Sequence, residues 1–212
     1  MFKAIKKNAT NLIKNVNSNV VIVCASKYYN EKTIRYLYSL GITHFGESRT
    51  KDLLEKQQQL KDLNITWHFI GSLQTNKVKD IINNISYLHS LDRESLAKEI
   101  NKHRIKPLKC FIQLNLANEK TKKGLSKSKL SDFYELLKEY DKIKPIGIMQ
   151  MGVYNNPSLT KEVYKEANSI KNNLNLEELS IGMSNDYLTA IDNGATFIRI
   201  GSLFTKEVNN EQ

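Results

Sequence analysis

Short, mostly apolar runs alternate with longer charged segments along almost the whole chain, and this alternation constrains the fold more than any other feature. Eight runs have the length and composition of β-strands: residues 20–25, 43–46, 66–71, 87–91, 108–116, 145–151, 178–182 and 196–200. Seven segments between them carry apolar residues at the three-and-four spacing of one helix face: residues 31–39, 51–60, 76–82, 93–103, 129–140, 158–172 and 186–192. The pattern predicts eight strands, each but the last followed by a helix.

This order predicts a parallel sheet built from strand–helix–strand units. The regular period favours a single α/β domain over residues 1–212, a (β/α)8 TIM barrel. A doubly wound open sheet is the alternative, but Ser26 to Tyr29 follow the first strand where that fold has a glycine-rich turn. Residues 2–16 form an extra N-terminal helix whose apolar side chains are expected to pack on the barrel: Phe2, Ile5, Leu12, Ile13 and Val16.

The amino-acid composition limits which binding partners and which cellular compartment we expect for the protein. The 212 residues carry 32 Lys and Arg against 22 Asp and Glu, but only five are Arg and the Lys residues are scattered from Lys3 to Lys206. A functional nucleic-acid face clusters its charges, so only weak, non-specific binding is expected. No apolar stretch approaches the roughly 18 residues of a membrane span, and the N-terminus is unlike a secretory signal. We therefore expect a cytoplasmic protein in which Cys24 and Cys110, inside apolar runs, are buried and inert.

Lys27 is the first candidate functional residue. In a barrel of this kind the chemistry sits at the C-terminal ends of the strands, and Lys27 comes after Ser26 at the end of the first strand. A lysine partly removed from water loses affinity for its proton and can condense with aldehydes. The competing interpretation is a solvated lysine at a strand end.

The last two strands predict a phosphate site. The seventh runs into Gly182-Met183-Ser184 and the eighth into Gly201-Ser202. Loops after strands seven and eight are the common phosphate site of the barrel, where backbone N–H groups meet a dianion. The competing interpretation is that the serine only caps a helix and the glycines only form turns.

Arg199 and His68 lie within predicted strands. Arg199 alternates with two isoleucines, so its charge needs a partner. It either closes a buried ion pair with a carboxylate such as Glu47 or lies under a bound ligand and contacts a ring nitrogen. His68 is either a core histidine or a catalytic one. A reactive lysine, a phosphate site and an arginine under a ring together suggest pyridoxal 5′-phosphate, and neither a metal-ligand spacing nor a nucleophile elbow is present.

Seven segments also carry a family resemblance: ASK at 25–27, HFGE at 44–47, WHFIGSLQTNK at 67–77, QLN at 113–115, KG at 123–124, LSIGMSND at 179–186 and IRIGS at 198–202. On these segments the chain resembles the YggS/PROSC (PLPBP) family of pyridoxal phosphate homeostasis proteins. The resemblance covers almost the whole chain in the order of the family. It implies an alanine-racemase-like N-terminal barrel of fold type III.

The resemblance also implies a cofactor site. Lys27 would form a Schiff base with pyridoxal 5′-phosphate, and Arg199 would face the pyridine nitrogen and keep it unprotonated. The other implied cofactor contacts lie in the loops after the second, seventh and eighth strands: Ser48, Met183, Ser184, Gly201 and Ser202. Ser48 stands where the family usually has Asn, whose amide is longer.

The function implied is a reversible, monomeric carrier of pyridoxal 5′-phosphate in vitamin B6 homeostasis, serving pyridoxal-phosphate-dependent apoenzymes without robust turnover. Related racemases take a second base from an additional β domain, and only ten residues follow Ser202. One alternative is a racemase-like amino-acid enzyme that uses Tyr28, His68 or Tyr154 as second acid–base group. Another is a sugar-phosphate enzyme in which Lys27 and the same phosphate site hold a triose or pentose phosphate.

Overall fold

Eight parallel strands close into a barrel in sequence order, with β1 paired to both β2 and β8. The computed structural model describes residues 1–119 and 121–206, and the following bounds refer to these residues. The strands are β1 (Val21–Ala25), β2 (His44–Glu47), β3 (Thr66–Phe69), β4 (Tyr87–Leu91), β5 (Leu108–Gln113), β6 (Ile143–Met149), β7 (Glu178–Met183) and β8 (Phe197–Ile200). The predicted TIM barrel is confirmed.

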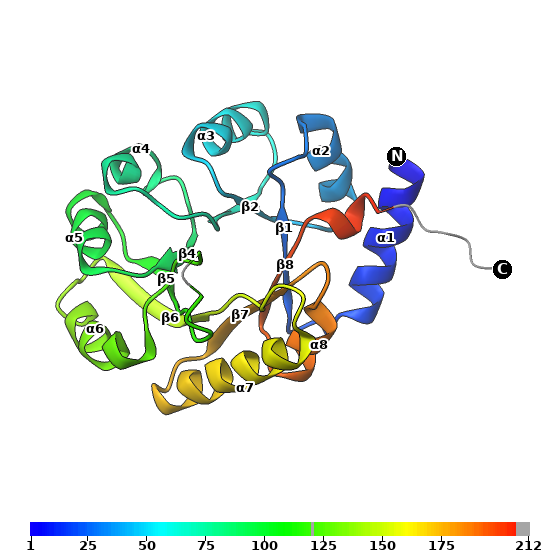
Figure 1. Cartoon of the computed structure of the whole chain (residues 1–212). Helices are drawn as coiled ribbons and strands as arrows, with labels where there is room; N and C mark the ends of the chain where they lie inside the picture. Colours follow the sequence, from blue (N-terminus) through cyan, green and yellow to red (C-terminus); the bar gives the residue numbers. More distant parts are fainter. Residues whose placement is uncertain (120, 207–212) are drawn as a thin grey trace.

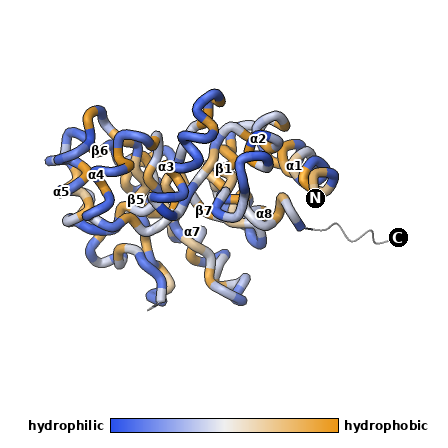
Figure 2. The backbone as a smooth tube through the Cα atoms, turned by 90° about the horizontal axis from the view of Figure 1, so that it is seen from above, coloured by the Kyte–Doolittle hydropathy of each residue, from blue (hydrophilic) through white to orange (hydrophobic). Residues whose placement is uncertain are grey.

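Helices surround the barrel, as Figure 1 shows. The α-helices are α1 (Phe2–Asn15), α2 (Glu31–Ser39), α3 (Thr50–Gln59), α4 (Val78–Ile81), α5 (Glu94–His103), α6 (Leu130–Leu137), α7 (Pro157–Asn173) and α8 (Tyr187–Asp192). Short 3-10 turns are η1 (Thr75–Lys77), η2 (Lys127–Lys129) and η3 (Ser202–Phe204). Figure 2 shows hydrophobic and hydrophilic residues alternating along the outer helices, as expected for helices with one buried face.

Two hydrophobic clusters hold these layers together. The larger one lies between the strands and the helices and includes Phe45 and Tyr164, both fully buried. The smaller one comprises Val23, Phe111, Met149 and Phe197, which point away from the helix layer. The interior of the barrel is therefore filled with side chains, as in other barrels of this size.

The N-terminal helix packs as predicted at three of its five apolar positions. Ile5, Leu12 and Val16 are buried, but Ile13 is 39% exposed, so its predicted packing is wrong. Phe2 is 42% exposed and makes only an edge-on contact with Tyr36 of α2, with 4.8 Å between ring centroids. Figure 1 shows α1 beside α2 and beside η3, the red segment that follows β8.

The fold also shows how deeply the two cysteines are buried and how long and apolar the helices are. Cys24 and Cys110 are free and fully buried, and burial raises the pKa of both thiols, so they are inert as predicted. Within residues 1–119 and 121–206, every helix is too short or too polar to cross a bilayer.

Candidate cofactor site at the mouth of the barrel

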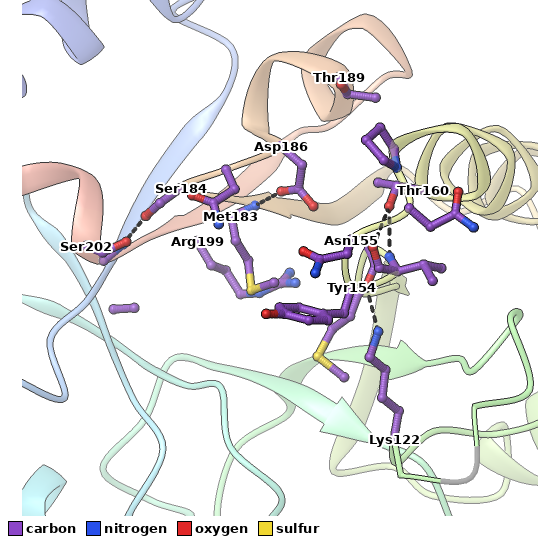
Figure 3. A pocket seen from close by; sticks show the side chains of 18 of the residues that line it. Lys122, Tyr154, Asn155, Thr160, Met183, Ser184, Asp186, Thr189, Arg199 and Ser202 are labelled. Atoms are coloured by element: carbon purple, nitrogen blue, oxygen red, sulfur yellow. Dashed lines mark hydrogen bonds between the residues drawn. The ribbon is translucent and has the colours of Figure 1, made fainter. Parts of the chain in front are cut away.

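A cavity of about 650 Å³ opens above the C-terminal ends of four adjacent strands, β6, β7, β8 and β1. Its lining carries four charged side chains: Lys27, Lys122, Asp186 and Arg199. Figure 3 shows the side chains of Arg199, Met183 and Tyr154, which all line the cavity. Three cationic groups against one carboxylate suit an anionic ligand.

Lys27 lines this cavity but is not shielded from water. Its side chain is exposed, and its ammonium group lies 4.7 Å from the ring centroid of Tyr28. Of the two interpretations of Lys27, the structure fits the solvated lysine at a strand end and not the partly desolvated one, because Lys27 extends beyond the apolar strand that precedes it. The geometry instead offers an accessible primary amine at the edge of the cavity.

A buried ion pair fixes the residue next to Lys27. Lys56 of α3 donates to a carboxylate oxygen of Glu47 at 2.5 Å and to the carbonyl oxygen of Ser26 at 2.7 Å. The hydroxyl of Ser26 donates to the same carboxylate oxygen at 2.7 Å. Because Glu47 and Ser26 are fully buried, this network fixes the end of β1 from which Lys27 projects.

The turn after β7 is shaped by a glycine and a carboxylate. Gly182 has a φ of +89°, and a Cβ there would lie 2.5 Å from the Cβ of Ala190 in α8, so only glycine fits. One carboxylate oxygen of Asp186 accepts from the Met183 N–H at 2.6 Å, and the other accepts from the Tyr164 hydroxyl at 2.9 Å. Met183 and Ser184 are thereby held at the rim of the cavity.

The turns after β7, β8 and β1 are joined by two hydroxyl groups. The Ser184 Oγ accepts hydrogen bonds from the backbone N–H groups of Gly201 and Leu203, both at 3.2 Å, as part of the network in Figure 3. The Tyr29 hydroxyl donates to the Gly201 carbonyl at 2.6 Å. Burial raises the pKa of Tyr29 to about 12, so it remains a donor at neutral pH. The predicted phosphate residues Ser184, Gly201 and Ser202 all line the cavity, and so does Met183, a predicted cofactor contact.

Arg199 lies at the floor of the cavity with its charge incompletely paired. Its Nη1 donates to the carbonyl oxygen of Ser180 at 2.9 Å and to the Ser180 hydroxyl. Its Nη2 is buried and has no hydrogen-bond partner within the described ranges. The proposed ion pair with Glu47 is wrong, because Glu47 is occupied by Lys56. A buried guanidinium nitrogen without a partner is costly unless a ligand supplies an acceptor.

Two further candidates lie outside the cavity lining. Ser48 is half-buried after β2, one strand beyond the four that surround the cavity. His68 is fully buried inside the barrel and is hydrogen-bonded to two other histidines, so it is a core histidine and cannot act on a ligand in the cavity. Tyr28 and Tyr154 do line it and are 82% and 83% exposed.

Sequence reasoning missed three residues that shape or line the site. Lys56 lies three residues after the buried Leu53, a spacing that places it toward the barrel side of its helix. The Asp186 carboxylate accepts from the backbone N–H of Met183, three residues earlier in the chain, a contact that the sequence alone does not mark. Lys122 donates to Glu119 at 2.6 Å and to the Gly152 carbonyl at 2.7 Å from the loop after β5, and no local pattern marks it.

Comparisons with known proteins identify the family of this chain. Residues 2–207 match the family described as alanine racemase, N-terminal domain. The pyridoxal phosphate homeostasis protein of Aquifex aeolicus is 37% identical over 193 residues, which cover 86% of this chain and 85% of that protein. The chain belongs to the pyridoxal phosphate homeostasis protein family. The family member from Helicobacter pylori is 35% identical over 89% of this chain and 88% of its own length.

Solved structures extend the family relationship. The structure of PipY from Synechococcus elongatus without pyridoxal phosphate has a TM-score of 0.90 at 28% identity and covers 95% of this chain and 100% of PipY. PipY with pyridoxal phosphate bound has a TM-score of 0.88 at 27% identity over the same shares. Alanine racemase from Corynebacterium glutamicum, at 15% identity and a TM-score of 0.75, shares the fold over 100% of this chain and 62% of the racemase. The family resemblance seen in the sequence is confirmed.

Proposed function

We propose that the cavity binds pyridoxal 5′-phosphate and that the protein takes part in intracellular vitamin B6 homeostasis. The observation that carries this proposal is the buried Nη2 of Arg199, which has no hydrogen-bond partner in the part of the chain that the structure describes. The unprotonated nitrogen of a pyridine ring supplies the acceptor that this donor needs. The relatives named above, and PipY with pyridoxal phosphate bound, support the proposal.

Residues in, or directly after, three adjacent strands, β7, β8 and β1, would hold the group. Arg199 faces the ring nitrogen, and Ser184, Gly201 and Ser202, with Met183 in the same rim, receive the phosphate. Bound there, pyridoxal 5′-phosphate supplies an aldehyde that condenses with a primary amine. The exposed ammonium of Lys27, on the next strand, is the amine that we assign to this role. Ser48 stays a predicted contact, because it lies outside the cavity lining.

We also propose that the protein is a monomeric, cytoplasmic carrier without robust turnover, which exchanges the cofactor with pyridoxal-phosphate-dependent apoenzymes and binds neither membranes nor specific nucleic acids. The homeostasis role in the names of its relatives supports this. Tyr154 at the cavity keeps a racemase-like enzyme as the second candidate. Assays of the loaded protein with a panel of amino acids separate the two, since sustained racemisation at enzyme-like rates contradicts the carrier.

Ser184→Asp tests the phosphate assignment. The new carboxylate lies at the rim between the turns after β7 and β8 and repels a dianion, so the affinity for pyridoxal 5′-phosphate, measured by equilibrium dialysis, should fall at least about tenfold. Ser95→Asp adds the same charge at an exposed position of α5 and should leave the affinity unchanged. Equal affinities for both variants would contradict the proposed phosphate site.

A further inference from the structure

Three of the chain's four histidines lie in one row inside the barrel. The Nδ1 of His44 in β2 lies 2.9 Å from the Nε2 of His68 in β3. The Nδ1 of His68 lies 2.9 Å from the Nε2 of His89 in β4. The Nδ1 of His89 lies 2.8 Å from the Oγ of Ser180 in β7. Because β7 stands opposite β3 in the closed order of strands, the row crosses the barrel.

The row ends at the floor of the cavity. Arg199 donates from Nη1 to the hydroxyl of Ser180 and, at 2.9 Å, to its carbonyl oxygen. The Arg199 side chain is 7% exposed overall, while Ser180 and His89 are fully buried. The row thus connects the half-buried His44 to the guanidinium group that lines the cavity.

The imidazoles of the row are neutral at neutral pH. Burial lowers the pKa of His68 and His89 well below the ordinary value and also lowers that of His44. The neighbouring groups act in the same direction or are aromatic. Tyr87 stacks on His68 with 4.5 Å between centroids, the Lys109 ammonium lies 5.1 Å from the Tyr87 ring, and Phe111 and Phe197 flank His89. The Arg199 charge further opposes protonation of His89.

Neutral imidazoles and one serine then leave a single consistent direction for the hydrogen bonds. A guanidinium can only donate, so the Ser180 oxygen accepts from Arg199 and its hydrogen is free to donate to the Nδ1 of His89. His89 then carries its proton on Nε2 and donates to His68, which donates from Nε2 to His44. In the reverse direction the Ser180 oxygen would accept two hydrogen bonds, and its own buried hydrogen would have no acceptor within the described residues, which is costly.

We propose that His44, His68 and His89 form one directed hydrogen-bonded line that, through Ser180, positions Arg199 at the cavity floor. Arg199 sets the direction of the hydrogen bonds in the line. The line in turn orients the Ser180 O–H toward His89, so that the lone pairs of the Ser180 oxygen face Arg199. His44, His68, His89 and Ser180 are positioning residues. The proposal rests on the proposed function only in what Arg199 contacts in the cavity.

The direction of the line is measured by 15N NMR of the imidazoles in the full-length protein without added cofactor at pH 7.5. We expect His44, His68 and His89 to be neutral and protonated on Nε2, with the His103 signals identified from their loss in His103→Gln. A proton on Nδ1 of His68 or His89, or a charged imidazole in the row, would overturn the proposal.

Coupling along the line is tested with a matched pair of serine variants. A proton on the Nδ1 of His44 would have to be donated to His68, so every hydrogen bond of the line would change direction. The Ser180 hydroxyl opposes this change, because its hydrogen would lose its acceptor, and Ser180→Ala removes that hydroxyl. The pKa of His44 should therefore rise by about half a unit or more, although two histidines separate the residues. Ser90→Ala, beside His89 on β4, removes a buried hydroxyl that has no hydrogen-bond partner among the described residues and should not shift it. Equal shifts, or none, would overturn the coupling.

Binding of added pyridoxal 5′-phosphate tests the positioning of Arg199 independently of the NMR measurements. Ser180→Ala should move the absorption maximum of added pyridoxal 5′-phosphate and weaken its binding at least about threefold, because Arg199 loses the hydroxyl and keeps only the carbonyl oxygen of residue 180. Ser90→Ala should match the wild type. Unchanged binding in Ser180→Ala would contradict the positioning role. No binding to the wild-type protein, with the NMR results as expected, would refute the proposed function and leave the line standing.

Discussion

At the scale of single residues, the ion pair of Lys56 and Glu47 stabilises the end of β1 from which Lys27 projects into the mouth of the barrel. Lys56→Met leaves the fully buried Glu47 carboxylate without a counter-charge, and Nζ also no longer donates to the Ser26 carbonyl. Breaking a buried pair in this way lowers the free energy of unfolding by about 3–5 kcal/mol. Urea denaturation followed by circular dichroism measures the change.

Lys51→Met is the control, because Lys51 lies in the same helix and its ion pair with Glu55 spans 3.7 Å with Lys51 83% exposed. An exposed pair of this kind contributes little, so stability should stay at the wild-type value. A second variant, Lys56→Met with Glu47→Leu, removes both charges and should regain much of the loss. A Lys56→Met protein as stable as Lys51→Met would contradict the role of the buried pair.

The buried histidines predict a pH dependence of stability. The folded-state pKa of His68 and His89 lies well below that of the unfolded chain, so the unfolded state binds more protons as the pH falls. Stability is then complete above the unfolded value of about 6.5 and decreases below it, by at most about 3 kcal/mol per pH unit for two sites. Urea denaturation between pH 7.5 and 5.5 measures the slope, and a flat profile would contradict neutral histidines in the core.

The sequence identified the cavity residues better than their partners. Lys27, Ser184 and Arg199 could be found because each follows or lies in a strand whose position in a barrel is known. The partner of Arg199 could not, since Ser180 and Glu47 are both polar residues in other strands and only the packing decides between them. The row of histidines is equally hidden, because its members lie on three different strands.

At the scale of elements, the turn between β7 and α8 predicts a specific effect of glycine replacement. Gly182→Ala places a Cβ 2.5 Å from the Cβ of Ala190 at a φ of +89°. The strain costs about 1–3 kcal/mol, and the shift of Met183 and Ser184 should weaken binding of pyridoxal 5′-phosphate. Thermal unfolding and equilibrium dialysis measure the two effects.

Gly41→Ala separates backbone strain from the contact with α8. Gly41 has a φ of +98°, but a Cβ there meets no described atom within 4 Å. This variant should lose stability through its backbone conformation alone and keep the wild-type affinity. If both variants bind the cofactor equally well, the Gly182 turn does not shape the phosphate site.

The order of the elements was predictable from hydrophobic periodicity, but several of their ends were not. The strand predicted over 108–116 ends at Gln113, because Leu114 leaves β5 for a single bridge to Leu125. The strand predicted from residue 145 begins at Ile143, and its register shifts beside Pro145, which has no N–H for the ladder. The helix predicted over 76–82 is a 3-10 turn followed by the short α4. Apolar patterns record burial, whereas these ends depend on backbone pairing.

At the scale of the whole molecule, closure of the barrel brings the first strand next to the last. Lys27 and Gly201 are 174 residues apart in sequence, yet β1 pairs with β8, and the Tyr29 hydroxyl reaches the Gly201 carbonyl at 2.6 Å. The candidate site therefore exists only in the closed fold. Its four strands, β6, β7, β8 and β1, are consecutive around the barrel, which explains why Ser48 after β2 lies outside the cavity lining.

Covalent labelling of the full-length protein tests the central claim most directly. The protein is incubated with pyridoxal 5′-phosphate, reduced with borohydride, and the labelled lysine is located by peptide mass spectrometry. We expect a visible absorption band before reduction and the label on Lys27, with both lost in Lys27→Ala, which keeps its fold because the side chain is exposed. Lys122→Ala, at the other lysine lining the cavity, should still be labelled at Lys27. A label on Lys122 instead, or no label with excess cofactor, would contradict the account.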